Sequence, residues 1–155
     1  MTEILSMVGT CTVLKHDWKP RHIIYSSLLD DFTLSSSSLC PGLANVVDAL
    51  KHEDMESGVG TQSEGVAFLQ FSFAEEVTIN AIWIGIGGVH QGWSASHLNG
   101  AAFQWSATAL SWTTILHVRE VDTGSVKRIA CAPSKAKYFR FLRCRGSVGL
   151  SYLKF

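Results

Sequence analysis

The chain has 155 residues, with 13 Lys and Arg against 13 Asp and Glu, so its formal net charge is zero. Charged residues make up 17% of the sequence and hydrophobic residues 46%, which excludes a disordered chain and a protein that works through a strong overall field, such as a basic nucleic-acid coat. The length predicts one domain that spans residues 1–155.

The N-terminal part of the chain combines one short predicted strand with two long loops. The strand is predicted at Thr10–Lys15. Trp18–Leu43 contains a run of serines and no clear period, so it is predicted as a loop. Apolar residues at helical spacing make Ala44–His52 the one helix candidate, of one or two turns. His52–Gly65 is polar and contains glycine, which predicts the second long loop.

The rest of the chain is predicted to form strands. Val66–Phe73 alternates, which places Ala67, Leu69, Phe71 and Phe73 on one buried face. A turn is predicted next, at residues 75–76, and a third long loop over residues 87–99. Further strands are predicted at Val77–Ile86, Gly100–Ala107, Ser111–Arg119, Ser125–Cys131, Lys137–Cys144 and Val148–Phe155. Short strands at this spacing favour an all-β sandwich.

The four cysteines are predicted to be free thiols. Their spacing fits no zinc motif, and the N-terminus lacks the basic region and apolar run of a secretory signal. Together these observations predict a cytoplasmic location. The cysteines are Cys11, Cys40, Cys131 and Cys144.

No metal and no cofactor are predicted. Loop oxygens over residues 48–61 could coordinate calcium chemically, but a solvated acidic loop is the favoured interpretation. The candidate side chains would be Asp48, Glu53, Asp54 and Thr61.

Catalytic motifs are missing from the sequence. It contains no G-x-S-x-G, no H-E-x-x-H and no P-loop, so no enzyme activity is predicted. A late group of basic residues could form an anion patch, but ordinary solvation of strand faces is favoured, and no nucleic-acid partner is predicted. The group comprises Lys127, Arg128, Lys135, Lys137, Arg140, Arg143 and Arg145.

Six segments occur in an order that is typical of one known family. They are A-N-V-V-D-A-L ending at Leu50, F-L-Q-F-S-F ending at Phe73, V-T-I-N-A-I-W-I ending at Ile84, Q-G-W ending at Trp93, F-Q-W-S ending at Ser106 and A-K-Y-F-R-F ending at Phe141. This order resembles that of discoidin domains, also called coagulation factor V/VIII type C domains, which are galactose-binding-domain-like. The resemblance extends over about residues 8–155.

The resemblance implies an eight-stranded antiparallel jelly-roll β-sandwich whose ligand contacts come from loops at one end. The corresponding loops here are Trp18–Cys40, His52–Glu64 and Val89–Leu98. One departure concerns the disulfide that joins the chain ends in many extracellular members. No cysteine follows Cys144, so that bond is not expected here.

Two tryptophans fall in these loops and are the candidate apolar contacts of a ligand. Trp18 and Trp93 could fill a partner pocket or stack on a sugar, with His16, Ser96 and His97 as the polar groups that orient it. Equally, a loop tryptophan could fold back onto the sandwich.

Three binding functions remain open. The preferred hypothesis is a non-catalytic module that binds a protein or peptide inside the cell. The alternative is a lectin-like domain that binds carbohydrate, and a binder of phospholipid headgroups is the third. No stretch approaches the roughly 20 apolar residues of a membrane span, so no transmembrane segment is predicted.

Overall fold

The computed structural model describes residues 32–38, 50, 58–87 and 92–155, together with the backbone of residues 2–5, 11–14 and 22–27. The strands are β1 (Thr2–Leu5), β2 (Cys11–Leu14), β3 (His22–Ser27), β4 (Phe32–Ser36), β5 (Val59–Gly60), β6 (Glu64–Gly85), β7 (Ala102–Ser106), β8 (Thr113–His117), β9 (Val126–Gly146), β10 (Gly149–Leu150) and β11 (Tyr152–Lys154). The described helix is a short 3-10 turn, η4 (Ala95–His97). No helix in the described part of the chain is long and apolar enough to span a membrane.

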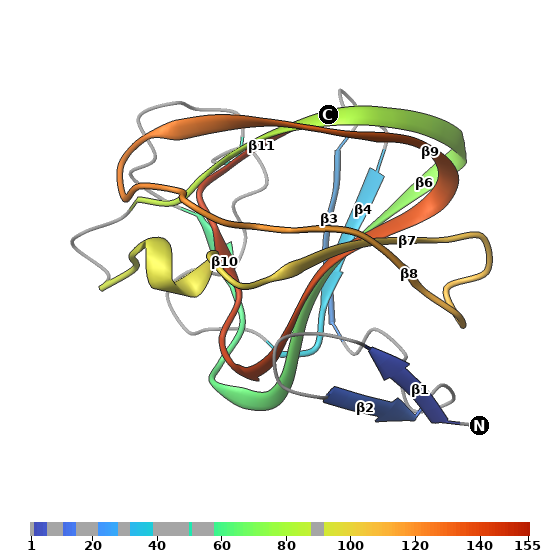
Figure 1. Ribbon diagram of the computed structural model, residues 1–155, viewed down its shortest axis with the longest axis horizontal. Helices are drawn as coiled ribbons and strands as arrows, with labels where there is room; N and C mark the ends of the chain where they lie inside the picture. The colour runs from blue at the N-terminus through green and yellow to red at the C-terminus, as the bar shows by residue number, and fades with distance from the viewer. Residues whose placement is uncertain are drawn as a thin grey trace.

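Two long antiparallel strands, β6 and β9, organise the fold (Figure 1). They pair from Glu64 opposite Gly146 to Gly85 opposite Val126. The first part of β6 lies between β4 and β9, and this layer continues through β3 on one side and through β7 and β8 on the other. The second part of β6 lies between β9 and β11. The two layers therefore share one strand pair that bends from one layer into the other.

The core lies between these layers and has the composition that the alternation predicts. Ala67, Leu69, Phe71 and Phe73 are all buried in it, as expected for one face of a strand. Phe155, which follows β11 in the opposite layer, meets the Phe71 ring edge to face at a centroid distance of 5.6 Å. Such aromatic pairs stabilise a core beyond the area they bury. The prediction of an all-β antiparallel sandwich is confirmed, although the described residues do not confirm the count of eight strands.

Two expectations about connections were wrong. Residues 75–76 do not form a turn, because β6 continues through them. Its pairing with β9 shifts register between Ser72 and Val77, but the strand does not end there. Trp18–Leu43 is not a continuous loop, because it contains β3 and β4. Bulges let a strand bend without ending, and that is why two predicted strands merge into one. The Ala44–His52 helix candidate lies outside the described residues except for Leu50, which is buried.

The outward face of the larger layer carries a buried polar row. Arg140 is only 1% exposed, and its Nε donates to Oε1 of Gln104 at 2.7 Å. Gln104 Nε2 in turn donates to Oγ1 of Thr114 at 2.9 Å, and the Arg140 guanidinium lies 4.1 Å from the ring centroid of Trp112. The register places Gln70, Arg140 and Gln104 side by side on three strands. A buried guanidinium needs such partners, because an uncompensated buried charge is costly.

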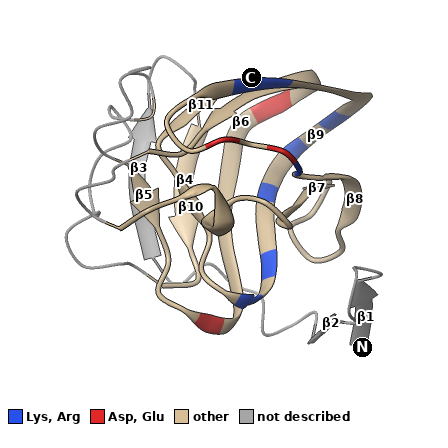
Figure 2. Ribbon diagram, turned by 60° about the vertical axis from the view of Figure 1, so that its left-hand side comes forward, with Lys and Arg blue, Asp and Glu red and all other residues tan. Residues whose placement is uncertain are grey.

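The predicted basic group is spread along the whole of β9 (Figure 2). Solvation of strand faces, the favoured interpretation, is wrong for Arg140, which is buried. Lys127 lies 3.7 Å from a Glu120 carboxylate oxygen, and Lys135 lies 3.6 Å from one of Glu76. These cations therefore do not act as one anion patch.

The expectation of four free thiols is wrong for Cys144, which is disulfide-bonded. Its partner lies outside the residues whose side chains are described. Cys131 is a free thiol, and burial raises the pKa of that thiol. Disulfides persist in oxidising compartments. The cysteines therefore no longer support the cytoplasmic location, which stays a prediction.

Thiol titration tests the disulfide directly. In denaturant without reductant, we expect at most two of the four cysteines to react, because two are joined to each other. After reduction all four should react. In the native protein Cys131 should react slowly, because the raised pKa leaves less thiolate. Four reactive thiols before reduction would contradict the bond.

Candidate functional site at the loop end

The described parts of the three predicted loops meet at one end of the sandwich. Ser38 Oγ donates to a Glu64 carboxylate oxygen at 2.7 Å and accepts from the backbone N–H of Gln62 at 3.0 Å, while Ser37 also donates to Glu64. We call this region the loop end and define it as residues 37–38, 58–64, 92–98 and 143–149. The predicted Trp18–Cys40 loop contributes Ser37 and Ser38 to the loop end, because its other described residues form β3 and β4.

Trp93 folds back onto the sandwich, which is one of the two outcomes left open by the sequence. Its side chain is 9% exposed and belongs to the core. The indole packs on Gly60 and Gly149, which are register partners in the β5–β10 pair. A methyl group added at Gly60 would lie 2.2 Å from Cη2 of Trp93, and one at Gly149 would lie 2.1 Å from Cζ3. The two glycines therefore provide the space for the indole.

His97 lies against this tryptophan. The two ring centroids are 4.7 Å apart and the planes are inclined by 57°. The backbone N–H of Ser94, the residue before η4, donates to Nδ1 of His97 at 3.1 Å. Nδ1 also lies 3.2 Å from the carbonyl oxygen of Ser94, so this ring nitrogen is engaged with the Ser94 backbone in either tautomer. No hydrogen bond to Nε2 is made by the described residues, which leaves this ring nitrogen for a ligand.

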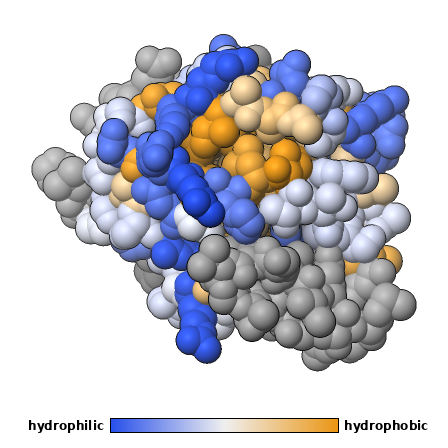
Figure 3. All heavy atoms as spheres, in the orientation of Figure 1, coloured by the Kyte–Doolittle hydropathy of each residue, from blue (hydrophilic) through white to orange (hydrophobic). Residues whose placement is uncertain are grey.

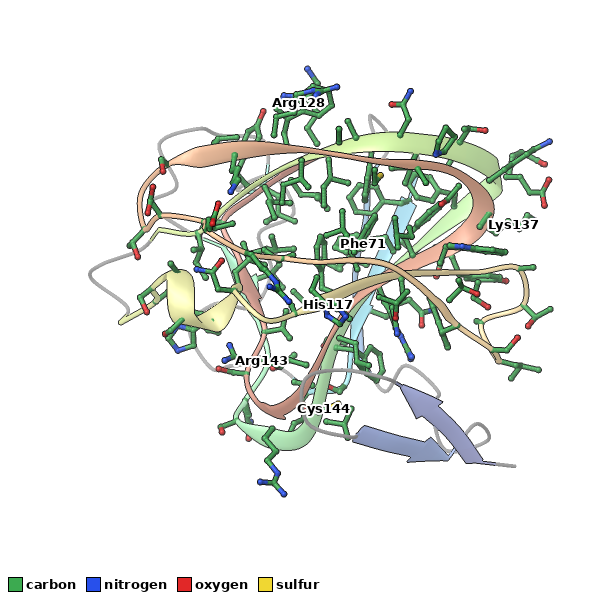
Figure 4. The ribbon with its side chains drawn as sticks, in the orientation of Figure 1. Phe71, His117, Arg128, Lys137, Arg143 and Cys144 are labelled. Atoms are coloured by element: carbon green, nitrogen blue, oxygen red, sulfur yellow. The ribbon has the colours of Figure 1, made fainter. Side chains whose placement is uncertain are left out.

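Arg143 completes the loop end from strand β9. Phe139 and Phe141 point into the core, and Arg143, two residues further, has the same orientation at the point where the core ends. Its Nη1 donates to the carbonyl oxygen of Ser96 in η4. Among the described residues this is the one hydrogen bond of the guanidinium, so its other N–H groups are available. Figure 4 shows Arg143 on the lower part of β9, below and to the right of the short helical turn.

The segment that carries His97 is held rigidly. Asn99 Nδ2 donates to the carbonyl of Val121 at 2.9 Å, and its Oδ1 accepts from the N–H of the same residue at 3.0 Å. Thr123 Oγ1 accepts from the N–H of Ala95 at 2.9 Å. Both ends of the Asn99 amide are therefore used within the protein, so Asn99 is a structural residue.

The structure brings three of the five predicted site residues together. Trp93, Ser96 and His97 lie in one segment, with Trp93 as buried support and the Ser96 hydroxyl exposed, 2.8 Å from that of Ser94. His16 and Trp18 lie outside the described residues. Ligand binding by these five residues stays a prediction.

Sequence reasoning missed Arg143. The signal was present, since an arginine follows two apolar residues at a spacing of two in a strand and so belongs at the rim of the core. The other basic residues nearby in the sequence hide this signal.

A metal centre is not formed by the described residues, in which no three His, Cys, Asp or Glu side chains gather. Thr61, one of the candidate calcium ligands, is buried, and its hydroxyl accepts from the N–H of Val148 at 3.0 Å and donates to the Gln62 carbonyl. Its hydroxyl is therefore occupied within the fold. Asp48, Glu53 and Asp54 lie outside the described residues.

Solved structures of carbohydrate-binding modules share this fold. The module CpGH89CBM32-5 of Clostridium perfringens, solved with GalNAc-β-1,3-galactose, has a TM-score of 0.58 at 14% identity, covering 79% of this chain and 93% of that one. A selenomethionine-labelled mutant of chitosan-binding module 1, from a chitosanase/glucanase of Paenibacillus sp. IK-5, has a TM-score of 0.57 at 14% identity, with coverage of 85% and 96%. A pectin-binding carbohydrate-binding module has a TM-score of 0.54 at 12% identity, with coverage of 86% and 89%.

Sequence comparison adds no assignment. No family model matches the chain. No curated protein matches it either. The likeness is therefore one of fold, and the fold is the galactose-binding-like β-sandwich that the resemblance to discoidin domains implied. Membership of the discoidin family itself stays a prediction.

Proposed function

We propose that this chain is a non-catalytic carbohydrate-binding module and that its ligand binds at the loop end. The observation that carries the proposal is the cluster of outward hydrogen-bonding groups around η4. His97 offers Nε2, Ser96 offers a hydroxyl and Arg143 offers guanidinium N–H groups, and buried Trp93 packs against the His97 ring. These groups come from a rigid strand and a fixed turn rather than from a free loop.

The chemistry of the cluster suits a sugar. Neighbouring hydroxyls on a sugar ring accept and donate hydrogen bonds, and a planar guanidinium can donate two parallel bonds to adjacent oxygens. The Ser96 hydroxyl can accept as well as donate, so both kinds of partner are present. Burial of Trp93 holds the His97 ring in place, and preorganised groups lose less entropy when they bind.

The structural relatives support the carbohydrate alternative over the protein or peptide partner that the sequence first favoured. The modules of known structure that share this fold include binders of GalNAc-β-1,3-galactose, chitosan and pectin. Sequence identities of 12–14% do not indicate which sugar this chain binds, so its ligand must be found by measurement.

Binding to a panel of glycans tests the proposal. We expect the wild-type chain to bind at least one oligosaccharide without carboxylates, with GalNAc-β-1,3-galactose and chitosan oligomers as the first probes, measured by calorimetry. Arg143→Ala should weaken that binding by roughly tenfold to a hundredfold, since hydrogen bonds from a charged donor contribute about 1.5–3 kcal/mol. His97→Ala should weaken it about tenfold, because one neutral hydrogen bond is lost.

Matched variants separate contact from folding. His117→Ala removes a histidine from β8, and Lys137→Ala removes a cation from β9, and both positions lie outside the loop end. Each should leave the affinity unchanged. His97→Gln keeps an acceptor for the Ser94 N–H, so its thermal melt should match the wild type while its affinity falls. Unchanged affinity in both loop-end alanine variants would refute the site, and no binding across the panel would refute the function.

A further inference from the structure

The outward face of the second layer carries a tryptophan between two cations. Trp83 is in β6, and its register partners are Arg128 in β9 and Lys154 in β11. The three side chains therefore form one row across three adjacent strands. We call this row the cationic row.

Both cations lie against the indole and yet remain exposed. The Arg128 guanidinium carbon is 5.2 Å from the Trp83 ring centroid, and Lys154 Nζ is 5.4 Å from it. The tryptophan is half-buried, whereas both cations are exposed. Figure 4 shows Arg128 pointing away from the body of the protein at the top of the view, and Figure 3 shows a hydrophilic surface there.

Among the described residues, the outward positions next to the row on these strands carry no charge. The next outward positions along the two strands, Ala81 and Ala130, are register partners, and Gly85 pairs with Tyr152 on the other side. No carboxylate stands in β6 between residues 81 and 85 or at its partner positions. Within the described residues, neither Arg128 nor Lys154 forms an ion pair, in contrast to Lys127 and Lys135.

Intramolecular cation–π contacts alone explain the row only in part. They stabilise exposed side chains modestly, but they do not neutralise the two positive charges, and no described carboxylate pairs with either cation. Adjacent strands lie about 4.8 Å apart, so the backbone positions of the two cations are separated by roughly 10 Å. The two cations approach the indole from the strands on either side of β6, so two carboxylates spaced along an extended chain can each pair with one of them.

We propose that the cationic row is a second binding site, which takes a glycan chain carrying carboxylates at regular intervals. Arg128 pairs with one carboxylate and Lys154 with another, while the exposed part of the Trp83 indole contacts the apolar side of the intervening sugar. The proposal rests on the proposed function for its choice of a glycan, and it places the site away from the loop end, which Arg143 marks in Figure 4.

A matched pair of polymers and a matched pair of variants test this site. The probes are polygalacturonate and its fully methyl-esterified form, which share a backbone and differ in charge. The variant Arg128→Ala/Lys154→Ala removes both cations of the row. The control Arg119→Ala/Lys137→Ala removes the same charge from described positions without a tryptophan between them. Affinity is measured by gel retardation and calorimetry at two salt concentrations.

Wild-type protein should bind polygalacturonate, and added salt should weaken that binding. The row variant should lose about tenfold or more in affinity, since each exposed ion pair contributes up to about fivefold. The control variant should lose much less. Binding of the esterified polymer should be weak in all variants. Trp83→Phe, which keeps a ring between the cations, should retain most of the affinity.

Several outcomes would overturn the proposal. Equal losses in the row variant and the control would mean attraction by overall charge and no site. Equal affinity for polygalacturonate and for its esterified form would show that the carboxylates are not recognised. Loss of polygalacturonate binding in His97→Ala but not in the row variant would place all binding at the loop end. Tighter binding of a single-stranded oligonucleotide that needs the row would assign it to nucleic acid. If the protein binds a glycan without carboxylates but does not bind polygalacturonate, the second site is refuted and the proposed function at the loop end is not.

Discussion

Replacing Trp93 by Ala is expected to lower the free energy of unfolding by about 3–5 kcal/mol, the usual cost of emptying a large aromatic site in a core. The indole fills the space above Gly60 and Gly149 and supports the His97 ring. Its loss leaves a cavity between the β5–β10 pair and η4. Chemical denaturation, read by circular dichroism, measures the change.

Two further variants test whether the loss of stability comes from the packing of the Trp93 indole. Gly149→Ala should destabilise the protein by about 1–3 kcal/mol through overpacking, because its methyl group would overlap the indole. Leu110→Ala removes a large side chain that is 51% exposed, and it should change stability by no more than about 0.5 kcal/mol. A Trp93→Ala variant that melts like the wild type but loses affinity would show instead that the indole contacts the ligand.

Replacing Gln104 by Leu is expected to cost about 3 kcal/mol or more, because it leaves the buried Arg140 guanidinium without the acceptor of its Nε–H. The same change removes the bond from Gln104 to Thr114. Leucine has a similar volume, so the loss reports the charge and its hydrogen bonds rather than a cavity. Thermal and urea denaturation measure the change in stability.

A double-mutant cycle decides whether the charge is the cause. Arg140→Met combined with Gln104→Leu removes both partners, and replacing a buried polar pair by apolar residues is often close to neutral. The double variant should therefore be more stable than the sum of the single changes predicts, by roughly 1–3 kcal/mol. Strict additivity would show that the two side chains act independently.

Local alternation was enough to predict the inner face of the first half of β6, because successive side chains in a strand point to opposite faces of the sheet. The bend of that strand was beyond local prediction. Residues 75–76 are both glutamates, which usually indicate a turn, but the pairs on both sides of them, Ser72 with Tyr138 and Val77 with Ala136, join the strand to β9. Strand β4 was missed because its buried serines hide the alternation of Phe32 and Leu34.

In the candidate site, too, local features could be predicted from the sequence and features that depend on distant residues could not. Its segment was predicted from a tryptophan and a histidine in a long stretch without a strand period. The burial of Trp93 depends on Gly60 and Gly149, which come from distant parts of the chain and meet only when β5 pairs with β10. The role of Arg143 likewise depends on where the core ends. Neither property is encoded within a short window of sequence.

The shared strand pair also constrains how the protein is made. Strand β6 leaves the ribosome well before β9, since residues 64–85 pair with residues 126–146 in reverse order. At roughly 5–20 residues per second, the nascent β6 waits for several seconds with its aromatic face and one edge unpaired. Pairings between such distant segments also form slowly. Newly synthesised chains therefore pass through an aggregation-prone interval in which chaperone binding would compete with misassembly.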